Sequence, residues 1–449
     1  MKSLFRQLKS GLSSLPLASA SYLALAFMLV ASAQAQSGPT KIVFASGPDE
    51  TGTVQRLIDD FNTANIDEIE VQWRTMDRDN DTHRLQIVEE LAAGSESINL
   101  IASDVIWTAE LAKNRWVEDL TKRFYASYER GSLLGPALDS ATYRLRIWGV
   151  PWYTDTGMLF YRKDLLAESG FAAPPATWSS LSEMAQKVMQ DSGTKHGFVF
   201  QGADYEGGTA NAAEFIWSAG GELVANQVTV SGMVVKNVTE RDKVLVDSAA
   251  AARGLDIARL LVSDNVAPAA VANFREQEAL DAFVAGDAVF LRSWPYAFNA
   301  LLKAGFTTDQ IGVAPLPAMT EGGASASCLG GWNLMINVNS SKAQKNAAWQ
   351  LIRYLTTPRQ QQRQAREAGL LPIVNALYED EELVSSVPVI ALGKKVLTSQ
   401  LRARPMSPFY SEISSSIAGV FNRTLQGELT GAEAAEILDK ELRPIVARN

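Results

Sequence analysis

The feature that most constrains this 449-residue chain is an alternation of short apolar runs with amphipathic helical segments. Apolar runs at residues 41–46, 69–73 and 98–107 predict strands, and a helical pattern follows each of them. Between residues 54 and 61, for example, apolar side chains recur at the spacing i, i+3, i+4 and i+7, which places them on one helix face. This β-α-β-α-β-α order predicts a mostly parallel sheet covered by helices.

The second helical segment is predicted to turn Leu85, Val88 and Leu91 inward and to end at Gly94. The alternation of strands and helices then restarts further along the chain. Because single hydrophobic cores seldom grow beyond about 250–300 residues, the length favours two domains. The fold class is therefore predicted as α/β, with two units that each have a sheet of their own.

The N-terminus has the layout of an export signal. Three cations and no acid precede an apolar run at residues 23–33, and the small-residue sequence AQA fits a cleavage site after Ala35. We therefore expect residues 1–35 to be a secretory signal peptide and the mature protein to be periplasmic. A membrane anchor is the alternative, but the run is shorter than the roughly 20 residues that a span needs.

Charge and rare residues exclude several function classes. Loss of residues 1–35 with their three cations would lower the formal net charge from −9 to −12, which disfavours nucleic acid and anionic membrane surfaces as partners. The single cysteine, Cys328, cannot form an intramolecular disulfide and is too distant from the signal for a lipid anchor, so we expect it to be buried. The two histidines, His83 and His196, are isolated, which disfavours a histidine metal site or a Ser-His-Asp triad.

These observations favour a binding protein, with neither a metal nor a cofactor predicted. In open α/β sheets, ligands bind at the carboxyl ends of the strands. In two-domain proteins, they favour the cleft between the domains. The residues that follow predicted strands are therefore the candidates for a binding site.

Five segments resemble the family 1 extracellular solute-binding proteins of ABC importers. The most specific is GVPWYTDTGMLFYRKDLLAESGFAAPPATW, which begins at Gly149. The others agree in the family's order: SGPDETGTVQRLIDDFN, INLIASDVIWTAELAKNRWVEDL, GDAVFLRSWPYAF and LGGWNLMINVNSSKAQKNAAWQLIRYL. Within the family, the trehalose/maltose-binding proteins are the most similar. The resemblance covers nearly all of the mature chain.

The resemblance implies a periplasmic-binding-protein fold of two lobes, with hinge strands and a ligand cleft between the lobes. We expect the N-terminal lobe to comprise residues 36–151 plus about 310–356, and the C-terminal lobe 152–309 plus about 357–449. The implied mechanism is hinge closure around a sugar and delivery to the membrane subunits of an ABC permease, which works with an ATPase. We expect the protein to be a monomer and not an enzyme.

A sugar site needs flat aromatic platforms for C–H faces and charged or amide groups for the hydroxyls. Glu50 matches a ligand-binding acid of the family by position, although it or Asp49 could instead cap a helix. Asp81 and Thr82 lie in an acidic loop, where the alternative is an N-cap. Asp104 follows an apolar run in LIASDVIW, and the resemblance implies that it accepts hydrogen bonds from hydroxyls.

The opening motif supplies two more candidates, Tyr153 and Asp155, if residues 151–156 cross from one lobe to the other. Trp294 and Tyr296 are predicted stacking residues, since Pro295 ends the strand before them; the alternative is a buried aromatic pair.

Further candidates lie near the C-terminus. Gly331 is predicted to offer its backbone to the ligand and Trp332 its ring, because glycine permits a close approach of the backbone. Arg404 would donate to sugar oxygens, although a surface salt bridge is the alternative.

Two other functions stay open. A secreted glycoside hydrolase would use paired carboxylates, and Asp104 and Asp155 could form such a pair. A binding protein for another solute, such as a polyamine, a metal or a peptide, is the other alternative. The single cysteine and two histidines disfavour a transition metal, and a polyamine or peptide site would keep the acids and aromatics but would not need Arg404. Trehalose, maltose, sucrose and glucosylglycerol would all use the same residue types; the resemblance to trehalose/maltose-binding proteins implies a small α-glucoside or disaccharide.

Overall fold

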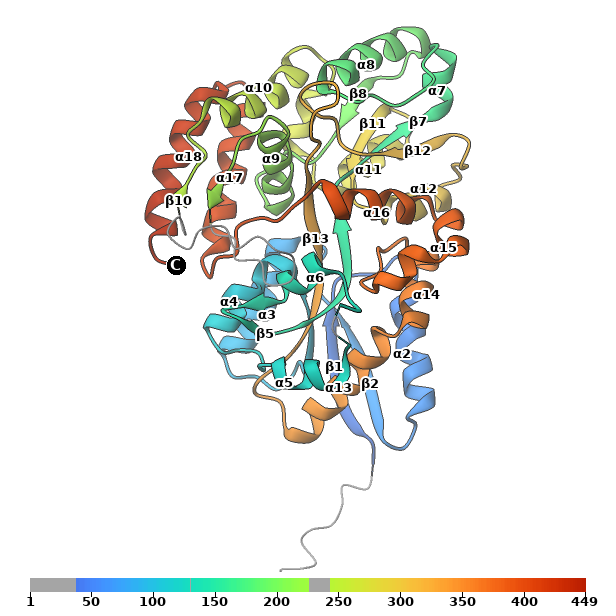
Figure 1. Ribbon diagram of the computed structural model, residues 1–449, viewed down its shortest axis with the longest axis vertical. Helices are drawn as coiled ribbons and strands as arrows, with labels where there is room; N and C mark the ends of the chain where they lie inside the picture. The colour runs from blue at the N-terminus through green and yellow to red at the C-terminus, as the bar shows by residue number, and fades with distance from the viewer. Residues whose placement is uncertain (1–37, 130, 226–242) are drawn as a thin grey trace, which may run out of the picture.

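The computed structural model describes residues 38–129, 131–225 and 243–449 (Figure 1). The predicted signal peptide, residues 1–35, lies outside the described residues. Two sheets form the centres of two lobes, one above the other in Figure 1, and strands run between them. The predicted α/β fold with two lobes is therefore confirmed.

The first sheet belongs to the lower lobe of Figure 1. Its six strands are β1 (Thr40–Ser46), β2 (Ile69–Thr75), β3 (Leu100–Asp104), β6 (Val150–Thr156), β13 (Ser327–Ile336) and β14 (Leu401–Arg402). Their spatial order is β14-β13-β3-β1-β2, with β6 also paired to β13. Strand β1 is parallel to β2 and β3, as predicted, while β13 runs antiparallel to β3 and β6.

The second sheet is mixed rather than parallel. Its strands are β7 (Met158–Arg162), β8 (His196–Val199), β11 (Ala288–Ser293) and β12 (Ile311–Ala314). They follow the order β12-β7-β11-β8, in which β7 is antiparallel to both of its neighbours and β11 is parallel to β8. Two short hairpins lie outside the sheets, β4 (Thr142–Tyr143) with β5 (Arg146–Ile147) and β9 (Val224–Ala225) with β10 (Lys243–Val244).

Helices cover both sheets. Around the first sheet lie α2 (Thr53–Ala64), α3 (Asn80–Ala92), α4 (Thr108–Lys113), α5 (Thr121–Ser127), α6 (Gly135–Ser140), α13 (Lys342–Leu355) and α14 (Pro358–Ala368). The other lobe holds α7 (Lys163–Glu168), α8 (Trp178–Ser192), α9 (Glu206–Ser218), α10 (Ala249–Ser263), α11 (Glu276–Val284), α12 (Ala297–Lys303), α17 (Tyr410–Leu425) and α18 (Gly431–Val446). Helices α15 (Glu381–Ser386) and α16 (Pro388–Ser399) and the 3-10 turns η1 (Val105–Trp107), η3 (Ala269–Asn273) and η4 (Asn375–Glu379) complete the described elements.

The chain crosses between the lobes at Gly157, since β6 pairs in the first sheet and β7 in the second. A side chain at Gly157 would place its Cβ 2.8 Å from Nη2 of Arg292. Arg292 is bound to Glu214, and Glu214 Oε1 also accepts a hydrogen bond from the backbone N–H of Cys328 (2.9 Å) on β13. One buried ion pair therefore contacts two of the strands that run between the lobes. Cys328 is buried, as expected.

The buried face of α3 differs from the prediction. His83, Ile87 and Leu91 are buried, whereas Leu85 is 52% exposed. The inner face follows the spacing i, i+4, i+8, which brings the histidine inward in place of the leucine. The predicted strand 98–107 also ends earlier, at Asp104, because the Asp104 carboxylate accepts a hydrogen bond from the N–H of Ile106 and caps a 3-10 turn.

Helix α14 lies against α2 of the first lobe. Arg363 of α14 pairs with Asp60 (2.6 Å), and Glu367 pairs with Arg56 (2.6 Å). These contacts favour an N-terminal lobe that continues beyond residue 356. The lobe limits drawn from the sequence stay a prediction.

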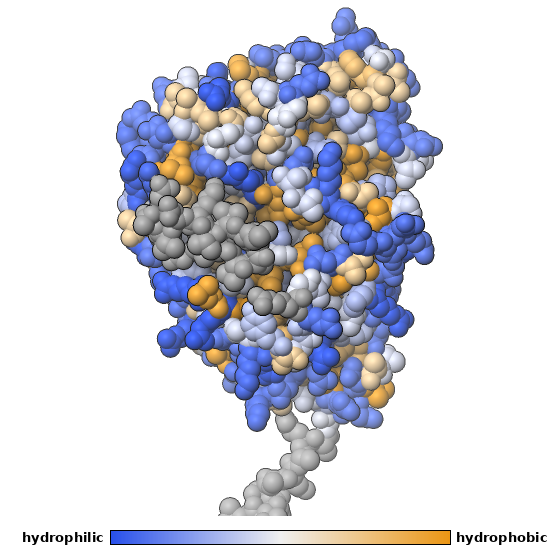
Figure 2. Space-filling view, in the orientation of Figure 1, coloured by the Kyte–Doolittle hydropathy of each residue, from blue (hydrophilic) through white to orange (hydrophobic). Residues whose placement is uncertain are grey.

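The surface in Figure 2 is mainly hydrophilic, with hydrophobic residues visible in the band where the two lobes meet. Beneath the surface, one buried hydrophobic cluster contains Phe44 and Leu334 of the first sheet as well as Leu291 and Phe283 of the second lobe. Among the described residues, none of the helices has the length and hydropathy of a membrane span.

Candidate functional site

Three of the predicted residues lie side by side on neighbouring strands. Trp332 of β13 pairs in register with Asp104 of β3 on one side and with Tyr153 of β6 on the other. Residues directly opposite each other in a sheet project their side chains from the same face. The first sheet therefore brings an acid, an indole and a phenol into one row, at the residue where β3 ends.

Two glycines beside this row allow close contacts, one with β6 and one with the second lobe. Gly331 has φ +116°, and a Cβ there would lie 2.5 Å from the carbonyl oxygen of Tyr153. A Cβ at Gly330 would lie 3.0 Å from the Trp294 ring and 3.1 Å from Cβ of Asp155. The absence of a side chain at Gly330 allows Trp294 to lie against β13 next to Asp155, and its absence at Gly331 allows β6 to pair closely with β13. A ligand contact of the Gly331 backbone remains a prediction.

The second lobe adds a wall of two aromatic residues and one acid. Trp294 donates a hydrogen bond from Nε1 to Oε1 of Glu276 (2.8 Å), and its ring lies 4.0 Å from the Arg292 guanidinium carbon. Burial raises the pKa of Glu276, against the hydrogen bonds from Trp294 and Tyr296, which lower it. Trp294 and Tyr296 are half-buried and packed against the hydrophobic clusters, so both predicted stacking residues are held by the core while keeping part of each ring accessible.

The carboxyl groups at the site have unusual electrostatics. Asp155 is buried, and its Oδ1 has no hydrogen-bond partner among the described residues. Burial first, and then the charges of Glu276 and Asp104, raise the pKa of Asp155 well above its ordinary value. Burial also raises the pKa of Asp104, although Asn80 donates to its Oδ2 at 2.8 Å. Any carboxyl of this kind accepts hydrogen bonds through both oxygens when it is charged, and donates one as well when it is protonated.

Arg404 connects the two lobes beside the acids and aromatic rings described above. Its Nη1 pairs with Glu206 at the start of α9, and its Nη2 donates to the carbonyl of Leu329 (3.0 Å) and lies 4.0 Å from Oδ1 of Asp104. The guanidinium is buried, so the alternative of a surface salt bridge does not describe it. Its Nε has no hydrogen-bond partner among the described residues. Donation to a ligand remains a prediction.

The other three predicted residues lie at the rim, where the lobes meet. Glu50 is exposed and pairs with Arg78, while Asp49 caps α2 by accepting from the N–H of Val54 (2.7 Å). The carbonyl of Glu50 accepts a hydrogen bond from Lys303 of the other lobe.

Asp81 and Thr82 lie in the first turn of α3. Asp79 is the N-cap, accepts from the hydroxyl of Thr82 (2.8 Å), and forms an ion pair with Arg275 of the other lobe. Partial burial, followed by the charges of Glu206 and Asp79, raises the pKa of Asp81 to about 6. The rim is therefore joined across the lobes by charged groups.

Sequence reasoning missed three residues of this cluster. Glu276 is the partner of Trp294, and Glu206 holds Arg404 together with hydrogen bonds from Tyr410 (2.8 Å) and Ser414. Tyr205 is buried, and its hydroxyl has no partner among the described residues. Glu276 and Glu206 each begin a helix, where an acid is common, so position alone did not distinguish them. An aromatic beside an acid, in the sequence YEGG, was the available signal for Tyr205.

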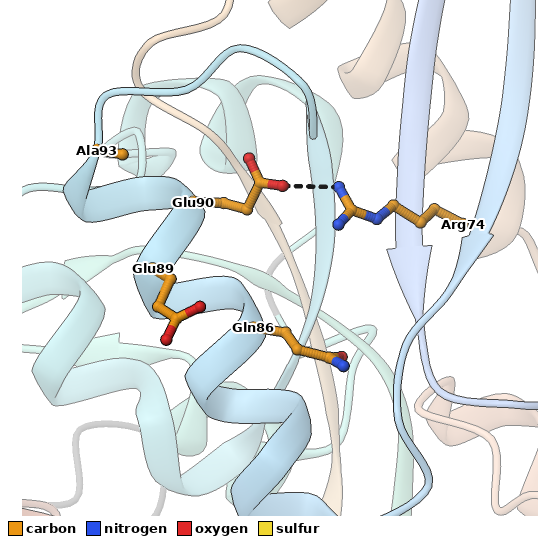
Figure 3. Close-up of a pocket in the computed structure, with 5 residues that line it drawn as sticks. All are labelled: Arg74, Gln86, Glu89, Glu90 and Ala93. Atoms are coloured by element: carbon orange, nitrogen blue, oxygen red, sulfur yellow. Dashed lines mark hydrogen bonds and ion pairs between the residues drawn. The ribbon is translucent and has the colours of Figure 1, made fainter.

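A surface pocket lies apart from this cluster, between β2 and α3 (Figure 3). Its lining residues are Arg74, Gln86, Glu89, Glu90 and Ala93, and Arg74 pairs with Glu90 at 2.9 Å. None of the predicted site residues lines it. Its charges satisfy one another on the surface, so it is a weak candidate for a specific site.

Comparisons with known proteins identify the family and support the two-lobe fold. A family model described as bacterial extracellular solute-binding protein matches residues 47–362. A probable ABC transporter-binding protein of Deinococcus radiodurans is 34% identical over 80% of this chain and 83% of that protein.

Among solved structures, maltose-bound MalE3 of T. maritima has a TM-score of 0.81 and 35% identity, over 90% of this chain and all of that chain. A solute-binding protein of Thermotoga lettingae bound to α-D-tagatose has a TM-score of 0.79 at 24% identity, over 91% of this chain and all of that chain, and supports the fold alone. With a family model that spans most of its length and a two-lobe fold built around a polar and aromatic cluster, this chain belongs to the bacterial extracellular solute-binding proteins.

Proposed function

We propose that this protein is the solute-binding component of an ABC sugar importer and that its ligand is a small α-glucoside or disaccharide of the trehalose or maltose type. It would act outside the cytoplasmic membrane after export, close its lobes around the sugar, and deliver it to a membrane permease. A monomer suffices for this role, because both walls of the site come from one chain.

One observation carries the proposal: indole rings from both lobes, Trp332 and Trp294, lie in one cluster with the buried carboxyls Asp104 and Asp155. Flat rings suit the apolar faces of a sugar, and the carboxyls suit its hydroxyls. Each hydrogen bond to a charged group contributes about 1.5–3 kcal/mol net. Three or four of them with stacking reach the roughly −8 kcal/mol of micromolar binding.

The choice of an α-glucoside is supported by the resemblance of the motifs and by the maltose-bound relative from T. maritima. Other relatives are named for other solutes, such as the mannitol-binding protein of Pseudomonas aeruginosa, which is 22% identical over 37% of this chain. A panel of ligands therefore has to include polyols as well as disaccharides.

Intrinsic tryptophan fluorescence tests the proposal. The protein is titrated with trehalose, maltose, sucrose, glucosylglycerol and mannitol, and with spermidine as a non-sugar solute. We expect at least one glucoside to change the emission with micromolar affinity. Trp332→Ala and Trp294→Ala should weaken binding at least tenfold, whereas Trp116→Ala, a half-buried tryptophan outside the cluster, should not. Binding of spermidine alone, or no response to any sugar, would overturn the proposal.

The hydrolase alternative has its own assay. The purified protein is incubated with trehalose or maltose for hours at micromolar concentration, and released glucose is measured. We expect no more glucose than from an Asp104→Ala control. Turnover above that control would show that the paired carboxylates act chemically.

A further inference from the structure

Trp332 is packed on one side by a histidine. The His83 and Trp332 rings are stacked, with centroids 5.1 Å apart and planes inclined by 24°. Trp107 meets Trp332 edge to face at 5.4 Å and also contacts the His83 ring at 5.3 Å. These three rings form a cluster in which Trp332 alone is half-buried, while His83 and Trp107 are buried. Two rings therefore restrict how the Trp332 indole can turn.

His83 is buried among rings, and the described residues give its Nε2 no polar partner. It is 1% exposed. Burial lowers its pKa to about 4, against the opposing charge of Asp77. Within the described residues, three or more metal-ligating side chains do not come together anywhere. The imidazole is thus a neutral flat ring whose contacts are made through its faces and edges.

We propose that His83 is a positioning residue that fixes the Trp332 ring as the platform on which the ligand stacks. The inference rests on the proposed function for the ligand, and on the ring geometry for the positioning. A stacking platform gains affinity when its orientation is set before the ligand arrives, because less rotamer freedom is then lost on binding. An apolar ring of similar shape at residue 83 should hold the Trp332 indole in the same orientation, because the packing uses no hydrogen bond from Nε2.

The test compares three variants. His83→Ala removes the ring, His83→Phe keeps a ring, and Leu91→Ala truncates a buried residue two turns further along α3. Three quantities are measured for each: the dissociation constant of the glucoside that binds best to wild type, acrylamide quenching of tryptophan emission, and the midpoint of unfolding. We expect His83→Ala to raise the dissociation constant at least tenfold and to increase quenching, and His83→Phe to stay within threefold of wild type. Leu91→Ala should lower the unfolding midpoint while its dissociation constant stays unchanged.

Two results would overturn the proposal. One is a His83→Ala protein that binds the sugar and resists quenching as well as wild type does. The other is a Leu91→Ala protein that loses as much affinity as His83→Ala, because that would show a general effect of destabilising α3. If wild type binds no sugar in the panel, the proposed function fails, but the quenching difference between His83→Ala and His83→Phe still decides whether His83 positions Trp332.

Discussion

Removal of Glu214 is the sharpest test of how the lobes are joined. The side chains of Glu214 and Arg292 are 4% and 2% exposed, and two hydrogen bonds of 2.7 Å join Nε and Nη2 of the guanidinium to the carboxylate. Nη1 donates to Oε1 of Gln201 at 3.1 Å. The same carboxylate accepts from Cys328 on β13, so it holds both the arginine and a strand that runs between the lobes.

In Glu214→Ala, the Arg292 guanidinium would stay buried with one amide as its side-chain partner. Loss of one member of a buried ion pair costs about 3–5 kcal/mol, because the remaining charge is uncompensated. Against a typical unfolding free energy of 5–15 kcal/mol, that is a large fraction. The measurement is chemical denaturation followed by circular dichroism and by tryptophan fluorescence, with the midpoint and slope compared to wild type.

A double variant supplies the control. In Glu214→Leu with Arg292→Met, both charges are gone and the volume is kept, so we expect most of the lost stability to return. The reasoning is refuted if Glu214→Ala lowers the unfolding free energy by less than about 1 kcal/mol, because a buried guanidinium without its ion-pair partner should destabilise the protein by more than that. It is also refuted if the double variant is as unstable as the single one, because the loss would then come from volume and not from charge.

Three further predictions follow from single sites. Gly331→Ala should destabilise the protein by about 1–3 kcal/mol, because φ is +116° and the new Cβ would lie 2.5 Å from the Tyr153 carbonyl oxygen. In the control Gly38→Ala, the new Cβ meets no atom within 4 Å, and an equal loss of unfolding free energy there would contradict the prediction. The pKa of His83 is lowered from 6.5 to about 4, so between those pH values only the unfolded chain gains a proton at this residue. The unfolding free energy should therefore fall by up to about 3 kcal/mol as the pH drops from 6.5 to 4. His83→Phe should lose this part of the pH dependence, and a pH profile identical to that of wild type would disprove the prediction. Asp155→Asn should weaken sugar binding about tenfold or more in calorimetry, because a charge-assisted acceptor contributes about 1.5 kcal/mol or more, and unchanged affinity would remove Asp155 from the site.

Local sequence patterns predicted the strands and helices well, because these elements depend on residues that are neighbours in the chain. The apolar run at residues 41–46 became β1, and the helix with apolar spacing between residues 54 and 61 became α2. On the inner face of α3, Leu91 was predicted correctly, Leu85 was predicted wrongly, and His83 was not expected there. Burial of a neutral histidine depends on the rings of Trp107 and Trp332, and both come from elsewhere in the chain.

The sequence placed candidate residues near one another where they follow strands and carry a recognisable motif; their contact with a ligand stays a prediction. Asp104 and Trp332 meet because their strands pair antiparallel, and the β-α-β pattern that predicts a mostly parallel sheet does not specify such a pair. The pairing of Glu214 with Arg292 spans 78 positions and has no local marker. Glu276 is an acid at a helix start, and its role becomes visible only when Trp294 is seen to donate to it. Long-range partners of this kind follow from the tertiary fold.

The central claim is that a sugar is held between the lobes by Trp332 and Trp294 and by the carboxyls of Asp104 and Asp155. A crystal structure of the protein with the tightest-binding glucoside tests it most directly. The account predicts a sugar ring stacked on the Trp332 indole, with hydroxyls within hydrogen-bond distance of at least one of the two carboxyls. A ligand bound outside this cluster, or one that contacts neither the indole nor the carboxyls, would contradict it.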